Sequence, residues 1–219
     1  SISAEKLEFP ILQEVKTVQV NEENKTKKYG AQFMDCKNLK TISAPLLNFI
    51  TPYMFSGCSS LSSVNMENVI EIGEKAFELC TSYKKLNFGE LQKVGKYLFK
   101  DYGLFSEIEL NKCSHVGSSS FESCQYLEEV KLKACTYIDH NAFKDCVNLK
   151  EIHLPNLISM SSGAFQNTAL VKVELNSLKI IYGNSVFQGC SKLTNVSMRN
   201  IIEIGNSLFQ NCICLINVD

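Results

Sequence analysis

Ten cysteines are the residues of this sequence with the most potential chemistry, because thiols bind metals, form disulfides and act as nucleophiles. Seven of them are separated by 22 residues or by a multiple of 22: Cys36, Cys58, Cys80, Cys124, Cys146, Cys190 and Cys212. Cys113 and Cys135 repeat the same interval in a second series. A zinc site needs close cysteine or histidine pairs that converge on one point. A regular interval distributes the thiols along a line instead, so the sequence predicts no metal site.

An even number of cysteines also allows a disulfide framework. Equivalent cysteines in stacked units, however, would project in parallel with β-carbons about 4.8 Å apart, whereas a disulfide needs about 3.5–4.5 Å. Free cysteine behaves as a small buried apolar residue with a weak donor. We therefore favour a packing role for the cysteine series over crosslinking.

Catalytic groups are no better represented. His115, His140 and His153 fall in different units, and no nucleophile or carboxylate forms a recognised motif with any of them. The sequence has no glycine-rich loop that would hold a phosphate. We predict that the chain is not an enzyme and has no cofactor.

The cysteine interval belongs to a more general repeat. Nine of the thirteen phenylalanines are spaced 22 residues apart, and each cysteine of the first series follows one of them by three positions: Phe33, Phe55, Phe77, Phe99, Phe121, Phe143, Phe165, Phe187 and Phe209. A fixed period of roughly 20–50 residues is typical of stacked units that cannot bury their apolar face alone. The sequence therefore predicts a solenoid.

Each unit carries the pattern of one short strand. Apolar residues stand nine and eleven positions after the phenylalanine, as at Val64 and Met66, which indicates a strand with one buried face. Glycine often follows the apolar residue at position seventeen, and we expect Gly73, Gly95 and Gly117 to supply left-handed backbone at bends.

The seventh unit departs from this pattern. It loses one residue after Thr168 and regains it before Gly183, so the phenylalanine interval is unchanged. We expect this slip to be absorbed in a loop without disturbing the buried spine.

The repeated unit resembles a known family. "LSSVNMENVIEIGEKAFELC" (61–80) and "LKEIHLPNLISMSSGAF" (149–165) are similar to the BspA-like leucine-rich repeats of bacterial and protozoan surface proteins, and the similarity extends from about Tyr29 to the end. It implies a leucine-rich-repeat solenoid of short parallel β-strands, stacked into a curved right-handed ribbon with irregular or short helical or strand segments on the other side. Residues 1–32 are expected to form a partial capping unit, and residues 33–219 eight full repeats and a truncated ninth.

The residues that flank position nine should be exposed on the strand face. The candidate protein-binding residues are Lys85, Asn87, Glu107, Glu109, Glu129, Lys131, Glu151 and His153. The glutamates concentrate in the middle of the array, which suggests a docking patch for a basic segment of a partner. The alternative is a solvated surface whose charges only keep the protein soluble.

Composition excludes other classes of partner. Twenty-two basic and twenty-three acidic residues give a net charge of −1, so nothing attracts nucleic acid or an anionic membrane in general. No apolar run approaches the roughly 18–20 residues of a membrane span, and the opening "SISAEKLEFP" lacks a signal-peptide pattern. We predict no nucleic-acid binding and no membrane insertion.

The family resemblance also implies a function. Similar proteins are cell-surface or secreted adhesins that bind host matrix proteins such as fibronectin or fibrinogen, or other cells. Two alternatives are a cytoplasmic interaction scaffold and a structural spacer or stalk. The exposed edges of the terminal coils further predict end-to-end self-association.

Overall fold

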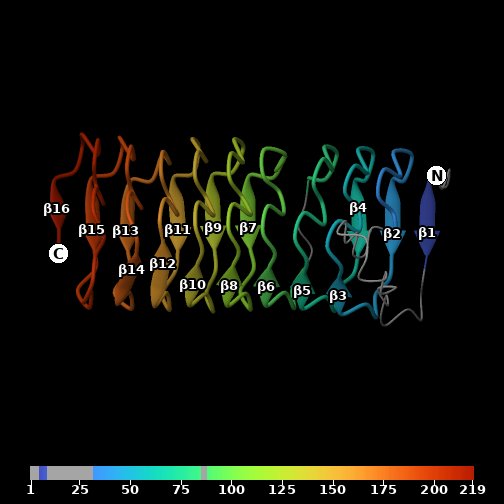
Figure 1. Ribbon diagram of the computed structural model, residues 1–219, viewed down its shortest axis with the longest axis horizontal. Coiled ribbons are helices and arrows are strands. Elements are labelled where there is room, and N and C mark those ends of the chain that lie inside the picture. Colours follow the sequence, from blue (N-terminus) through green and yellow to red (C-terminus); the bar gives the residue numbers. More distant parts are fainter. Residues whose placement is uncertain (1–4, 9–31, 85–87) are drawn as a thin grey trace, which may run out of the picture.

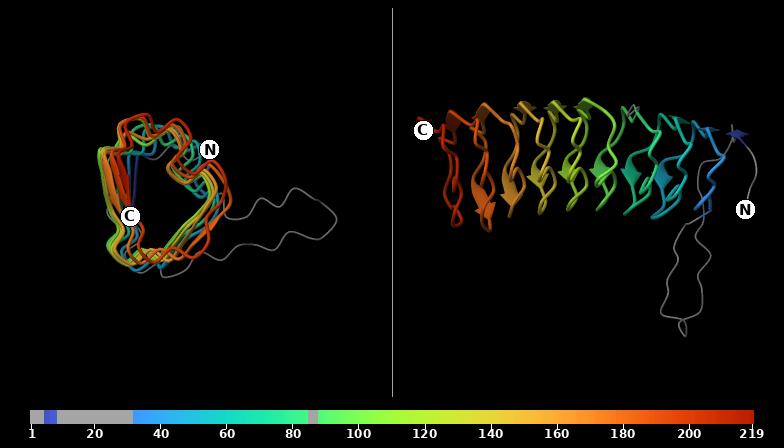
Figure 2. Two further views of the ribbon diagram at one scale, coloured as in Figure 1. Left: turned by 90° about the vertical axis from the view of Figure 1, so that its left-hand side faces the viewer. Right: turned by 90° about the horizontal axis from the view of Figure 1, so that it is seen from above.

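The computed structural model describes residues 5–8, 32–84 and 88–219. The chain is a parallel β-solenoid whose described coils contribute short strands to two rows along one axis (Figure 1). Viewed along that axis, successive coils superpose as one closed ring (Figure 2). No residue of these three segments is helical, so the side opposite the first row consists of turns and short strands alone.

The front row contains the strands that the sequence predicts, three residues long except at the last one. It consists of β1 (Lys6–Glu8), β2 (Thr41–Ser43), β4 (Ser63–Asn65), β7 (Glu107–Glu109), β9 (Glu129–Lys131), β11 (Glu151–His153), β13 (Lys172–Glu174), β15 (Asn195–Ser197) and β16 (Asn217–Val218). Its central residues point inward, as the alternation of apolar and polar residues requires.

The back row is a single seven-stranded parallel sheet. It consists of β3 (Phe49–Ile50), β5 (Glu71–Ile72), β6 (Lys93–Val94), β8 (His115–Val116), β10 (Tyr137–Ile138), β12 (Ser159–Ser161) and β14 (Ile180–Tyr182). The apolar residues of position seventeen form its buried side, from Ile50 to Met160.

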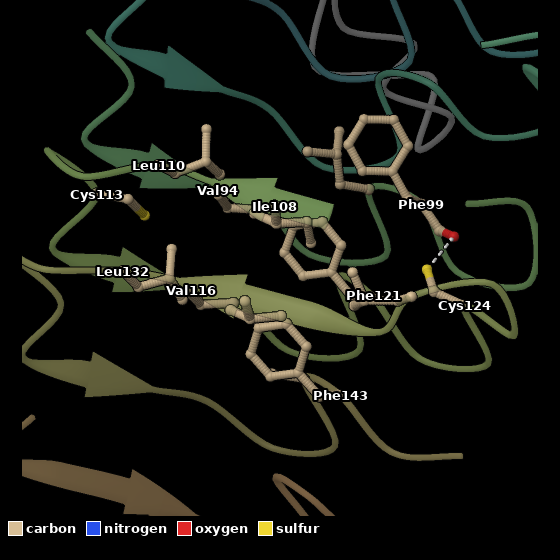
Figure 3. Packing of buried hydrophobic residues seen from close by; sticks show 14 of the residues in the cluster. Val94, Phe99, Ile108, Leu110, Cys113, Val116, Phe121, Cys124, Leu132 and Phe143 are labelled. Atoms are coloured by element: carbon tan, nitrogen blue, oxygen red, sulfur yellow. Dashed lines mark hydrogen bonds between the residues drawn. The ribbon is translucent and has the colours of Figure 1, made fainter. Parts of the chain in front are cut away.

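The phenylalanines form the predicted spine of the core. From Phe33 to Phe209, the ring centroids of successive coils lie 5.2–5.9 Å apart and the rings are stacked. Figure 3 shows Phe99, Phe121 and Phe143 beside the inward-pointing Ile108 and Val116. Aromatic pairs at this separation add to the free energy of simple burial, so the spine joins each coil to both of its neighbours.

Gly73, Gly95 and Gly117 do not have the predicted left-handed backbone. Apart from Gly183 (φ 113°), the described residues with positive φ lie two positions before or two positions after a spine phenylalanine, as at Ser119 (φ 52°) and Ser123 (φ 59°). Gly95 is needed for another reason: a β-carbon there would lie 2.5 Å from the backbone carbon of Gly73. These glycines allow close contact between stacked backbones, which the sequence of one unit does not reveal.

The compensated slip of the seventh unit is confirmed. Ser159 pairs with Ile180, only 21 residues later, while Phe165 and Phe187 keep their stacking at 5.7 Å. The slip has a consequence in the front row, where β7, β9 and β11 form one sheet and β13, β15 and β16 another.

The two ends differ. Strand β1 pairs with β2 in parallel, so residues 6–8 extend the front row by one strand, but most of the segment 1–32 lies outside the described residues and its separate capping role stays a prediction. In the last coil, Ile202, Ile213 and Ile216 are 79%, 81% and 83% exposed. End-to-end self-association through such apolar surface stays a prediction too. Within the described segments, no helix is long and apolar enough to cross a membrane.

Candidate protein-binding face

Six of the seven thiols of the first cysteine series hydrogen-bond to the backbone of the preceding coil in the described part of the chain. Cys124 Sγ donates to the carbonyl of Phe99 at 3.3 Å (Figure 3), and Cys146 Sγ donates to that of Phe121 at 3.0 Å. The same bond recurs at Cys58, Cys80, Cys190 and Cys212, always across 25 residues. Each thiol is thus a packing group that also satisfies a buried carbonyl.

Burial makes these thiols poor nucleophiles. Desolvation raises the pKa of Cys124 to about 12 and that of Cys135 to about 12. Because the thiolate is the reactive and metal-binding form, such groups are inert near neutral pH. The predicted packing role is confirmed: Cys36, Cys58, Cys80, Cys113, Cys124, Cys135, Cys146 and Cys190 are buried and free. In the described part of the chain, no three histidine, cysteine or acidic side chains are grouped to hold a metal ion.

The structure brings a carboxylate and a serine to one histidine, which no sequence motif indicates. His140 Nδ1 lies 2.6 Å from Asp139 Oδ1, and Ser118 Oγ donates to Asp139 Oδ2 at 2.6 Å. Burial raises the pKa of Asp139, but the hydrogen bonds from Ser118 and from the backbone and ring of His140 together outweigh it and lower this pKa to about 2. Serine and histidine both contact the carboxylate rather than each other, so this is not the nucleophile and base pair of a hydrolase.

The predicted face lies on β7, β9 and β11. Parallel pairing aligns Glu107, Glu129 and Glu151 in one line and Glu109, Lys131 and His153 in a second line two residues further along each strand. Both lines flank buried or half-buried central residues and point to solvent. We call these six residues the acidic face. Lys85 and Asn87 of the predicted set lie outside the described residues.

Lys131 joins the strands of the acidic face electrostatically. Its Nζ lies 2.9 Å from Glu129 Oε1 and 3.0 Å from Glu107 Oε1, and these two bonds raise the pKa of Lys131 above its usual range. Asn111 Nδ2 donates to Glu109 Oε1 at 2.7 Å. Exposed ion pairs of this kind add little to stability. The four glutamates against one lysine therefore matter chiefly for the negative field that they present.

Sequence reasoning missed a second feature of this face. A hollow of about 730 Å³ lies between β11 and β13, and its lining includes Ile152, His153, Pro155, Val171 and Glu174. Ile152 is only half-buried and Val171 is 40% exposed. The one-residue loss after Thr168 is the signal in the sequence that marks this place.

Comparison with known protein families gives one match. The pattern described as "BspA type Leucine rich repeat region" matches residues 25–146 and 114–219, with six copies. Together these ranges cover nearly the whole chain. No curated protein matches the sequence.

Two solved structures share the fold. A leucine-rich repeat protein from Bacteroides ovatus ATCC 8483 superposes with a TM-score of 0.61 at 22% identity, over 97% of this chain and 62% of the other. A leucine-rich repeat protein from T. pallidum gives 0.57 at 24% identity, over 74% of this chain and 69% of the other. The present chain thus spans less than two thirds of the Bacteroides chain.

Proposed function

The chain belongs to the BspA-type leucine-rich repeat family, and from this premise we propose that it is a non-enzymatic protein-binding domain whose acidic face docks a basic segment of a partner. Repeat domains of this kind generally bind through the extended surface that their strands present. A fold alone does not determine a partner, so the choice of surface must come from the side chains.

The observation that carries the proposal is the alignment of Glu107, Glu129 and Glu151 on three paired strands, with Glu109 beside them. The strands fix the spacing of these carboxylates, which means that a partner meets them without an ordering cost for the backbone. A surface of one predominant sign steers an oppositely charged segment toward it and accelerates association.

We further propose that the domain acts at a cell surface or in secreted form as an adhesin. The support is the resemblance to surface proteins with the same repeat. The matching partners would be host matrix proteins, with fibronectin and fibrinogen as the first candidates, or proteins on other cells.

The test is binding of the purified chain to immobilised fibronectin and fibrinogen at low and physiological salt. A Glu109→Lys/Glu129→Lys variant should lose saturable binding, chiefly through a slower association rate. The matched control is Glu71→Lys/Glu203→Lys, which makes the same charge change away from the acidic face, at β5 and at the residue that pairs with Ile180 of β14, and it should bind like the wild type.

The outcomes separate the alternatives. Equal binding by both variants would remove the acidic face from the proposal. Binding of neither matrix protein would favour a cytoplasmic scaffold or a structural spacer over an adhesin. Circular dichroism and thermal melting of each variant show that a loss of binding does not come from unfolding.

A further inference from the structure

The front row is interrupted between β11 and β13, although the coils that carry these strands remain stacked (Figure 1). Before the interruption, the Leu132 N–H donates to the His153 carbonyl at 3.1 Å. The corresponding pair across the interruption is the Leu154 N–H and the Glu174 carbonyl, and in the described segments these two groups are not bonded to each other. The sheet is therefore open between these two groups, although just before them the Val171 N–H still donates to the Lys150 carbonyl at 3.4 Å. We call this opening the gap.

The gap exposes apolar surface that the rest of the front row buries. Ile42, Val64, Ile108, Val130, Val173 and Val196, the other described central residues from β2 to β15, are all buried. Ile152 alone is half-buried, and the neighbouring Val171 is 40% exposed. The hollow over them measures about 730 Å³. A concave site with apolar walls and a few polar groups is the usual form of a site that receives a ligand group.

Charged residues surround this apolar floor. Glu151 and His153 lie on one side of the gap, and Lys172 and Glu174 lie on the other. Lys150 is neutralised by Glu128, whose Oε2 lies 2.9 Å from the lysine Nζ. The acidic face begins directly at the gap, because β11 belongs to both. A segment lying across the front row would therefore meet carboxylates first and an apolar hollow next.

We infer that the gap is the pocket for one apolar side chain of the basic partner segment, an inference that rests on the proposed function. Strands are about 4.8 Å apart, so the gap lies about 10 Å from the middle of β7 and β9. An extended segment rises about 3.3 Å per residue. The apolar residue should thus follow the basic residues by about three positions, and its backbone can hydrogen-bond to the open groups of Leu154 and Glu174.

Labelled peptides test this spacing on the full 219-residue chain. The probe is Gly-Ser-Arg-Arg-Ser-Gly-Leu-Ser-Gly, in which leucine follows the second arginine by three positions. One control peptide replaces the leucine by serine, and a second places it next to the arginines. Burying a leucine side chain is worth enough to tighten binding about tenfold or more. Fluorescence anisotropy should show that advantage for the probe over both controls.

Protein variants locate the effect. Val171→Glu places a charge in the gap and should abolish the preference for leucine. Val147→Glu makes the same change at a 51% exposed valine in a turn outside the front row, and it should preserve the preference.

The results distinguish the inferred pocket from the proposed docking at the acidic face. If the leucine and serine peptides bind equally, and both lose binding in Glu109→Lys/Glu129→Lys, the gap is not a pocket and the acidic face stands. If the leucine preference persists in that charge-reversed variant, the pocket stands and the acidic face fails. If no peptide binds, both proposals are overturned.

Discussion

At the scale of single residues, the repeated cysteine combines two properties that no other small side chain offers together. Its volume and apolarity suit a buried ladder next to the phenylalanine spine, and its thiol donates to a carbonyl of the coil before. Thr168 occupies the equivalent place in the seventh unit, where its hydroxyl donates to the carbonyl of Phe165 in its own coil at 3.0 Å. In the seventh unit a donor at this position is therefore kept although the thiol is lost.

We expect Cys146→Ala to lower the free energy of unfolding by about 1–2 kcal/mol, because it removes a buried donor and leaves a small cavity. Cys214→Ala should change it by less than about 0.5 kcal/mol, since Cys214 is exposed. Urea denaturation of the two variants and the wild type checks this. Equal effects at the two sites would contradict the structural role of the thiol ladder.

The buried thiols also predict a loss of stability in alkali. Burial raises the pKa of Cys124 and Cys135 from 9.0 to about 12, so their stabilising contribution is complete below pH 9 and is lost as the pH rises toward 12. In that window the unfolded chain binds fewer protons than the folded one, and each such thiol lowers the free energy of unfolding by about 1.4 kcal/mol per pH unit. Denaturant titrations at pH 7 to 11 measure the slope.

The control for this slope is Cys124→Thr, which places at the site the residue found naturally at position 168. This variant should reduce the slope of the free energy of unfolding against pH by the contribution of one thiol. Below pH 8 its free energy of unfolding should be nearly that of the wild type. A free energy of unfolding that stays constant between pH 8 and pH 11 would contradict the predicted effect of the buried thiols.

The burial of the cysteines could be predicted from their 22-residue interval, but their hydrogen-bond acceptors could not. The acceptor lies 25 residues earlier, and its position depends on how far each coil is offset from the next. The interval likewise indicated the exposed glutamates. The two ion pairs of Lys131, with Glu107 and with Glu129, depend on side-chain positions across two strands and could not be predicted. The sequence pattern thus shows the repeat length and which side chains are buried or exposed. The hydrogen-bond and ion-pair partners depend on contacts between coils, which the pattern does not show.

At the scale of the element, the turns contain two kinds of special position: residues with left-handed backbone, and glycines where neighbouring coils come into close contact. Serine, asparagine and aspartate occupy many left-handed positions around the phenylalanines, as at Asn141 (φ 55°) and Asp145 (φ 58°). Glycine occupies the place where the backbones of successive coils nearly touch. The sequence suggested left-handed turns correctly but assigned them to the wrong residues, because close approach between coils has no local signature.

We expect Gly95→Ala and Gly89→Ala to act in opposite directions. A β-carbon at Gly95 would lie 2.5 Å from backbone atoms of Ile72 and Gly73, so alanine should lower the free energy of unfolding by about 1–3 kcal/mol. At Gly89 no described atom lies within 4 Å, and alanine should raise it by about 0.4–1 kcal/mol by restricting the unfolded chain. Thermal melting compares the two. Loss of stability of the same size at both sites would refute the stacking explanation.

The gap is the element-scale feature that the sequence anticipated only in part. One missing residue after Thr168 predicts a slip, and the structure confirms it. Whether the slip closes or opens the sheet depends on whether the hydrogen bonds of β13 can still reach β11. The back row continues through β12 and β14 because Ser159 pairs with Ile180. The front row keeps the Val171 N–H bond to the Lys150 carbonyl at 3.4 Å, but the Leu154 N–H and the Glu174 carbonyl are not bonded to each other.

At the scale of the whole molecule, stability is approximately the sum of each coil's own contribution and its contacts with its neighbours. An internal coil has two such contacts and a terminal coil has one. The spine makes this difference visible at single side chains. Phe121 stacks on Phe99 at 5.9 Å and on Phe143 at 5.2 Å, and it is fully buried. Phe209 stacks only on Phe187 among the described rings, at 5.7 Å, and is half-buried.

Phe121→Ala should therefore cost about 3–5 kcal/mol, the range for a phenylalanine removed from a packed core. Phe209→Ala should cost clearly less, because its ring has one neighbour and its cavity opens to solvent. Chemical denaturation gives the free energies, and amide exchange locates the damage: it should spread to the coils on both sides of Phe121 but stay in the last coils around Phe209. Equal losses at the two positions would contradict a stability that is the sum of the coils and their neighbour contacts. They would indicate instead that the whole solenoid unfolds as one cooperative core.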